Sequence, residues 1–180
     1  MTDFATQGPV GLAGGAVFVA LLAAAAVMDV KARRIPNRLV VVIAAAGLLY
    51  TLLQSPTLGA VGRSLLAGSI GFALWIPFYA LRMIGAGDVK LFAAAGLWLV
   101  PLQVVQAAVV AAIIGGILSL IGMLTGYGSG LTLLRLAHAV RQPETLMTES
   151  GRVVGKTLPY GVAMAVGLAI AGWAPRLFGA

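Results

Sequence analysis

Apolar residues are grouped in six long runs, which shorter polar or glycine-containing segments separate. The runs cover residues 10–28, 39–54, 60–81, 89–101, 103–124 and 158–174. A helix that crosses a bilayer needs roughly 20 mostly apolar residues, so the pattern predicts an all-α, polytopic membrane protein with about six transmembrane helices. The fourth run is the shortest, and it can span only if its polar flanks enter the headgroup region or the bilayer thins there. We expect one transmembrane domain over residues 1–180.

Basic residues are distributed unevenly between the two sides of the predicted bundle. One side carries ten of the twelve Lys and Arg residues: Lys31, Arg33, Arg34, Arg38, Arg82, Lys90, Arg135, Arg141, Arg152 and Lys156. The other side holds Arg63 and Arg176. Because Lys and Arg are enriched in cytoplasmic loops, this split predicts a cytoplasmic loop at residues 125–157 and both termini outside the cytoplasm. Within that loop, residues 131–141 have the pattern of an amphipathic helix that lies on the membrane surface.

The composition agrees with a membrane protein and excludes several other classes. Hydrophobic residues make up 61% of the chain and charged residues 9%, with a mean hydropathy of +1.03, whereas soluble domains are about a quarter charged. The net charge of +7 comes from clusters beside apolar runs, so we expect contacts with lipid headgroups and none with nucleic acid. Cysteine is absent and the single histidine, His138, has no acidic cluster beside it, so we expect no metal and no cofactor.

Two of the five acidic residues adjoin predicted membrane helices. Asp29 follows the first apolar run and Asp88 precedes the fourth, whereas Glu144 and Glu149 lie in the loop. The charge count places Asp29 and Asp88 on the cytoplasmic side, at the same depth. Two neighbouring carboxyl groups in a partly desolvated site share one proton, and such a pair hydrolyses a peptide bond when one group is the base and the other the acid. The sequence does not assign these two roles.

Each member of the pair also has a structural interpretation. Asp88 follows Gly85-Ala86-Gly87 and could be a helix N-cap, while Gly85 and Gly87 could supply unusual φ angles or room for an extended substrate. Asp29, at the carboxyl end of its helix, could form a salt bridge with a basic neighbour. The candidates for that salt bridge are Lys31, Arg33 and Arg34.

The remaining candidates flank the two acids. Pro36 and Asn37 are expected to start the second helix. Lys31, Arg33, Arg34 and Lys90 are explained as topology determinants or, alternatively, as groups that orient or polarise the pair. Lys90 is the first choice for that role because it is two residues from Asp88.

The segments DVKARRIPN at residues 29–37 and GAGDVKL at residues 85–91 together resemble type IV prepilin peptidases. These are membrane aspartyl proteases with a G-x-G-D motif, and the resemblance is greatest to the short CpaA/TadV-like form of Flp pilus systems. It implies a multi-pass protein of the bacterial inner membrane that removes the leader of a single-span prepilin at the cytoplasmic face, with Asp29 and Asp88 as the catalytic pair. LPYG at residues 158–161 looks like a further shared element. The link from Asp29 to Asn37 is too short for the added methyltransferase domain of the long form.

Two other functions are compatible with paired acids in a membrane protein. A proton- or cation-coupled transporter uses such residues, although it usually places them near the midplane and often has internal repeats. A non-catalytic scaffold of a secretion system would use them only as helix caps. The oligomeric state and the identity of the prepilin are not encoded in any motif.

Overall fold

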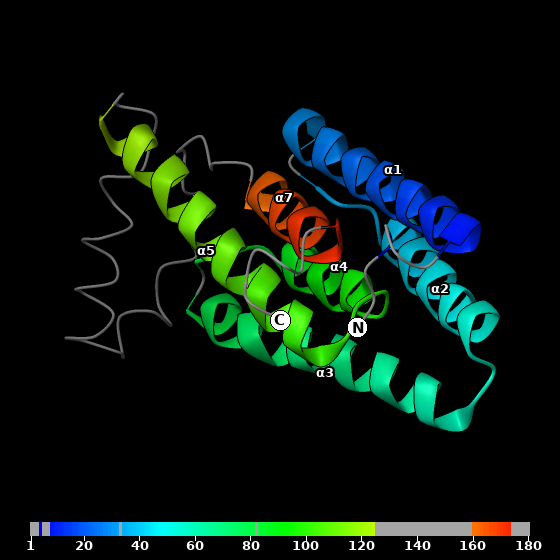
Figure 1. Cartoon of the computed structure of the whole chain (residues 1–180). Coiled ribbons are helices and arrows are strands. Elements are labelled where there is room, and N and C mark those ends of the chain that lie inside the picture. Colours follow the sequence, from blue (N-terminus) through cyan, green and yellow to red (C-terminus); the bar gives the residue numbers. More distant parts are fainter. Residues whose placement is uncertain (1–3, 5–7, 33, 82, 125–159, 174–180) are drawn as a thin grey trace. The chain divides into compact units, whose positions relative to one another are not determined.

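In the part of the chain that the structure describes, all regular elements are helices. The computed structural model describes residues 4, 8–32, 34–81, 83–124 and 160–173. The helices are α1 (Gly8–Ala32), α2 (Asn37–Gln54), α3 (Leu58–Ala80), α4 (Ala86–Gly96), α5 (Pro101–Leu124) and α7 (Tyr160–Trp173) (Figure 1). The all-α prediction is confirmed. The predicted surface helix at 131–141, the rest of the loop at 125–157 and Arg33 lie outside the described residues.

The chain divides into two compact units, Met1–Ile114 with Pro159–Ala180, and Gly115–Leu158. Helices α1 to α4 and α7 belong entirely to the first unit. Helix α5 begins in the first unit, and its residues from Gly115 onward belong to the second.

Four helices are long and apolar enough to cross a membrane, namely α1, α2, α3 and residues 101–121 of α5. Helix α7 is apolar but shorter, with 14 residues. The predicted fourth run at 89–101 is not one helix: α4 ends at Gly96, and a turn leads to Pro101. Its 11 residues rise only about 16 Å, roughly half of a hydrocarbon core. Six full spans and the location of both termini remain predictions.

Helix α4 lies among the other helices of the first unit. It packs against α3, α2, α7 and, with fewer contacts, α1, and it lies close to α2, α3 and α7 in Figure 1. Small residues allow this close approach, since a Cβ on Gly96 would lie 3.1 Å from the backbone oxygen of Ala67 in α3. A short helix enclosed in this way can bring a polar residue at its first turn to the inside of a membrane protein.

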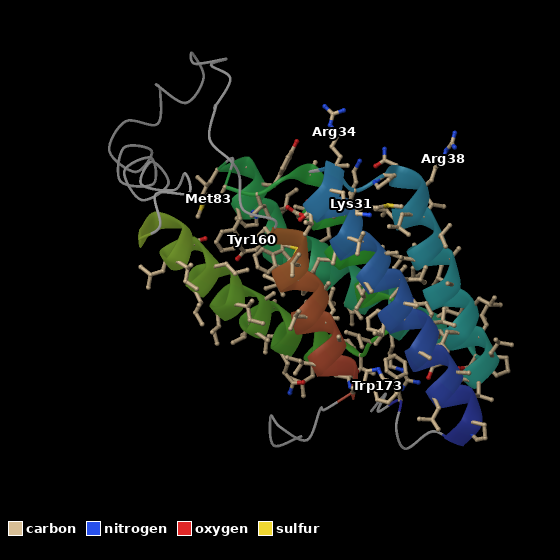
Figure 2. All side chains as sticks on the ribbon, turned by 90° about the horizontal axis from the view of Figure 1, so that it is seen from above. Lys31, Arg34, Arg38, Met83, Tyr160 and Trp173 are labelled. Atoms are coloured by element: carbon tan, nitrogen blue, oxygen red, sulfur yellow. The ribbon has the colours of Figure 1, made fainter. Side chains whose placement is uncertain are left out.

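The two ends of this group of helices differ in their side chains. Figure 2 shows the basic side chains of Lys31, Arg34 and Arg38 at one end, near the start of α7 at Tyr160, and Trp173 at the other end. Elsewhere, large apolar side chains point outward, such as Leu53 with 67% exposure. Apolar side chains that point outward suit contact with the hydrocarbon of a bilayer.

Candidate functional site

Asp29 lies on the buried face of α1. The residues that α1 buries are spaced four and three apart, as one helix face requires: Gly11, Gly15, Phe18, Leu22, Ala25 and Asp29. Only 8% of Asp29 is exposed. The sequence interpretation put Asp29 after the first span, whereas the structure puts it within α1, which continues to Ala32. The side chain therefore faces the neighbouring helices and not the lipid.

The carboxylate of Asp29 meets the first turn of α7. The backbone N–H of Gly161 donates a hydrogen bond to Oδ2 of Asp29 over 3.0 Å. The first N–H groups of a helix have no partner within the helix, and its positive dipole end favours an anion. The start of α7 thus offsets the unfavourable dipole at the carboxyl end of α1. The N–H of Gly161 is thus a partner of Asp29 in addition to the basic residues proposed for a salt bridge.

Asp88 is the third residue of α4, and Gly85 is the N-cap. Oδ2 of Asp88 accepts a long hydrogen bond, 3.4 Å, from the backbone N–H of Gly85. This is the carboxylate arm of a capping box. The interpretation of Asp88 as the N-cap residue itself is therefore wrong, although its carboxylate does help to cap the helix.

The two glycines of this motif have ordinary backbone conformations. Gly85 has φ −79° and ψ 151°, and among the described residues only Gly8 is a glycine with positive φ. The expectation that Gly85 and Gly87 supply unusual φ angles is wrong. A Cβ on Gly87 would lie 3.4 Å from that of Ile35, and one on Gly85 would lie 3.5 Å from Oδ2 of Asp88, so both positions have room for only a small group.

Asp29 and Asp88 influence one another electrostatically. Burial, followed by the negative charge of Asp29, raises the pKa of Asp88 from 3.8 to about 6, while the hydrogen bond from Gly85 acts in the opposite direction. Asp88 lies at the start of α4, outside the four helices long enough to span. An acid with this pKa holds its proton at mildly acidic pH and exchanges it near neutrality, as an acid–base catalyst must.

Lys90, Pro36 and Asn37 lie near one another at the starts of α4 and α2. Nζ of Lys90 donates a hydrogen bond to Oδ1 of Asn37 over 3.4 Å, and within the described residues it forms no ion pair with Asp88. Lys90 therefore joins α4 to the start of α2. Pro36 is the N-cap of α2 and Asn37 its first residue, which confirms that these two residues start the second helix.

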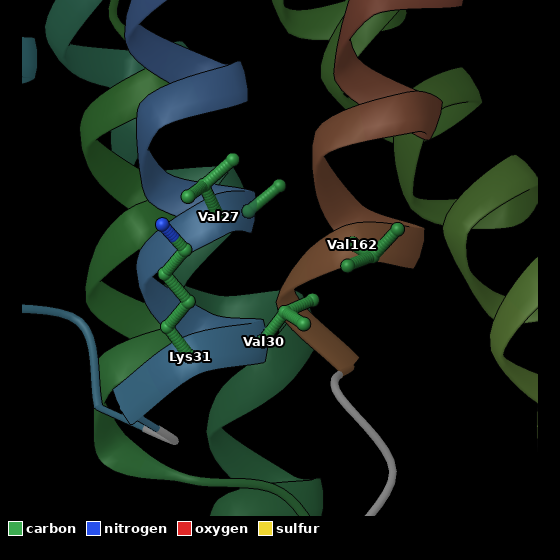
Figure 3. A pocket seen from close by; sticks show the side chains of 5 residues that line it. Val27, Val30, Lys31 and Val162 are labelled. Atoms are coloured by element: carbon green, nitrogen blue, oxygen red, sulfur yellow. The ribbon is translucent and has the colours of Figure 1, made fainter.

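A groove lies between α1 and α7, and its lining includes the residues that follow Asp29 and Gly161 in sequence. Its volume is about 260 Å³, and it is lined by Ala26, Val27, Val30 and Lys31 of α1 and Val162 of α7. Figure 3 shows the Lys31 side chain running along α1 toward Val27, while Val30 lies beside the start of α7, the helix that carries Val162. In sequence, Val30 follows Asp29 and Val162 follows Gly161, so an apolar surface starts one residue from the acid.

Tyr160 and Gly161 lie at the site although no acidic or basic residue type marks them in the sequence. Tyr160 packs edge-on against Trp75 of α3, with ring centroids 5.8 Å apart at 73°. Burial, followed by the negative charge of Asp88, raises the pKa of Tyr160. The segment LPYG was noted as a shared element, but no apolar pattern or acidic residue marked it as part of the site. The only sequence feature that could have indicated these two residues is the position of a tyrosine and a glycine at the start of an apolar run.

Comparison with known proteins places the chain beside one family. The profile described as the type IV leader peptidase family matches residues 16–120, more than half of the chain and a range that includes both acids. A protein of Klebsiella pneumoniae named prepilin leader peptidase/N-methyltransferase is 32% identical over 97 residues, which is 50% of this chain and 42% of that protein. The chain thus spans less than half of this relative. No solved structure matches.

Proposed function

Because the chain belongs to the type IV leader peptidase family, we propose that it is a membrane aspartyl endopeptidase that removes the leader of a prepilin. The observation that supports this best is the pair of acids, with Asp29 buried on α1 and Asp88 at the start of α4, where burial and then the charge of Asp29 raise the pKa of Asp88. In the proposed mechanism, one carboxylate takes a proton from a water molecule as the water attacks the peptide carbonyl. The protonated partner gives its proton to the carbonyl oxygen.

The environments of the two acids support an unequal sharing of one proton. Asp29 accepts a hydrogen bond of ordinary length, 3.0 Å, from the N–H of Gly161 at the start of α7, where the positive end of the helix dipole stabilises a negative charge. Asp88 has a longer hydrogen bond and a raised pKa, which favours its protonated form. In the resting pair, Asp29 is then the base and Asp88 the acid, although the coupled pair titrates as a unit.

We place the site at the cytoplasmic face of the bacterial inner membrane. The bundle end with the two acids also carries Lys31, Arg34 and Arg38 (Figure 2), and an excess of basic residues is typical of the cytoplasmic side. Basic residues at this level are also suited to contacts with anionic lipid headgroups.

The substrate proposed for this site is a Flp-type prepilin, whose apolar helix would lie beside α1 and α7. The groove at Val27, Val30 and Val162 offers an apolar surface that starts one residue from Asp29 and Gly161. A side chain just beyond the cut bond can enter it from the lipid.

The proposal does not include methylation of the new amino terminus. The printed name of the Klebsiella relative contains an N-methyltransferase, but α1 ends at Ala32 and α2 begins at Asn37. This link has no room for an added domain, so we propose the short, peptidase-only form.

Incubation of the purified chain in detergent with a Flp-type prepilin tests the function. We expect a mass loss equal to the leader, and none with the double variant Asp29→Asn/Asp88→Asn, which controls for contaminating proteases. A transporter or a scaffold would leave the prepilin intact with either protein, and that result would overturn the proposal.

A further inference from the structure

The first turn of α7 is linked to both acids through two consecutive residues. The N–H of Gly161 donates a hydrogen bond to Oδ2 of Asp29 over 3.0 Å. Burial, followed by the negative charge of Asp88, raises the pKa of Tyr160. Neighbouring residues of one helix have a fixed offset, so the hydrogen bond of Gly161 also fixes where Tyr160 lies relative to Asp29.

The ring of Tyr160 is held by a chain of aromatic contacts that leads to α4. Tyr160 packs edge-on against Trp75, which is only 3% exposed. Trp75 packs in turn against Phe92, with ring centroids 5.5 Å apart at 63°. Phe92 lies one helical turn after Asp88, on the same helix. The position of Tyr160 is therefore tied to the helices of both acids.

The hydroxyl of Tyr160 is available to a substrate. Among the residues that the structure describes, the indole N–H of Trp75 has no hydrogen-bond partner, so Trp75 contacts the tyrosine by ring packing. Within the described residues, the Tyr160 hydroxyl forms no hydrogen bond either, and the residue is only partly buried. A phenol keeps its proton near neutral pH and can donate it in a hydrogen bond.

We propose that Tyr160 is a third catalytic residue, which donates a hydrogen bond from its Oη to the carbonyl oxygen of the scissile peptide bond. This inference rests on the proposed function. Negative charge develops on that oxygen as water attacks, and a donor already in place stabilises it.

Tyr160 keeps its proton throughout the proposed reaction. As the C–O bond forms, one carboxylate takes the proton of water and the other carboxyl group protonates the carbonyl oxygen, which gives a gem-diol. The C–N bond then breaks: the leaving nitrogen receives the proton that the first group had taken, and the second group recovers its proton from the gem-diol. The tyrosine thus adds stabilisation without changing the proton balance.

The variant Tyr160→Phe tests the inference, because phenylalanine keeps the ring that packs on Trp75 and removes only the hydroxyl. We expect kcat for leader removal to fall about 100-fold, as loss of one oxyanion donor does, with KM within about twofold and an unchanged pH profile. The matched control is Tyr79→Phe on α3, where the tyrosine is 44% exposed, and it should cleave at the wild-type rate.

Two results would overturn the inference. A wild-type rate in Tyr160→Phe would mean that the hydroxyl does not act on the substrate. A lowered rate with a displaced pH profile would mean that Tyr160 acts through Asp88 as a positioning residue. If the wild-type protein itself removes no leader, the proposed function fails, which is distinguishable from either of these results.

Discussion

The contact between Gly161 and Asp29 predicts a sharp effect of one added methyl group. In Gly161→Ala, the new Cβ would lie 2.7 Å from Oδ2, 3.1 Å from Cγ and 3.2 Å from Cβ of Asp29. Ordinary contact begins at 3.4 Å, so the carboxylate or the start of α7 must move by about 0.7 Å, and a displacement near 1 Å at a catalytic group can cost about 100-fold in rate. We therefore expect kcat to fall on the order of 100-fold.

The same variant should remain folded, because two effects on stability oppose one another. Alanine favours a helix over glycine by about 1 kcal/mol, whereas weakening a hydrogen bond to a charged group costs about 1.5 kcal/mol or more. The net change is small, so we expect the melting temperature in detergent to move by only a few degrees.

The assay is leader removal from a prepilin, followed by mass, with thermal unfolding measured on the same samples. Gly62→Ala is the matched control, since Gly62 lies within α3 and its Cβ would meet nothing within 4 Å. A Gly161→Ala protein that is folded and cleaves within about twofold of the wild-type rate would refute the reasoning that a close approach of α7 positions Asp29.

Two further predictions concern Asp88 and the groove. Because burial and the charge of Asp29 raise the pKa of Asp88 from 3.8 to about 6, its contribution to stability is fully present below about pH 3.8 and is lost as pH rises through about 6. Thermal unfolding should show Asp88→Asn gaining stability relative to wild type between about pH 4 and 7; a constant difference would contradict this. Val27→Trp should fill the groove and raise KM about tenfold, as loss of one buried apolar contact does, whereas Val41→Trp, at a 64% exposed position on α2, should leave KM unchanged.

The helices were predictable because apolar runs and their polar ends are local features of the sequence. The start of α2 at Pro36 and Asn37 followed from their residue types, and α1 to α3 followed from run length. The end of α4 at Gly96 did not, because the apolar residues continue through the turn to Pro101. Hydropathy alone does not distinguish a short enclosed helix from a span.

The acids were predictable from their rarity, but their surroundings were not. Helix α1 is apolar on all sides, so its sequence does not show which face is buried or that this face includes Asp29. The partnership with Gly161 joins residues 132 positions apart, and no local pattern reports such a contact. The hydrogen bond from Lys90 to Asn37 joins residues 53 positions apart and is equally absent from any local pattern, while a role of Lys90 toward the acids stays a prediction.

Single-turnover cleavage by Asp29→Asn and Asp88→Asn tests the central claim most directly, since asparagine keeps the size and the capping ability of each residue. The matched control is Glu144→Gln in the predicted loop, which should cleave normally. We predict that each single variant loses leader removal as completely as the double variant, because the two acids act as one unit. Measurable cleavage retained by a folded Asp29→Asn or Asp88→Asn protein would contradict the account.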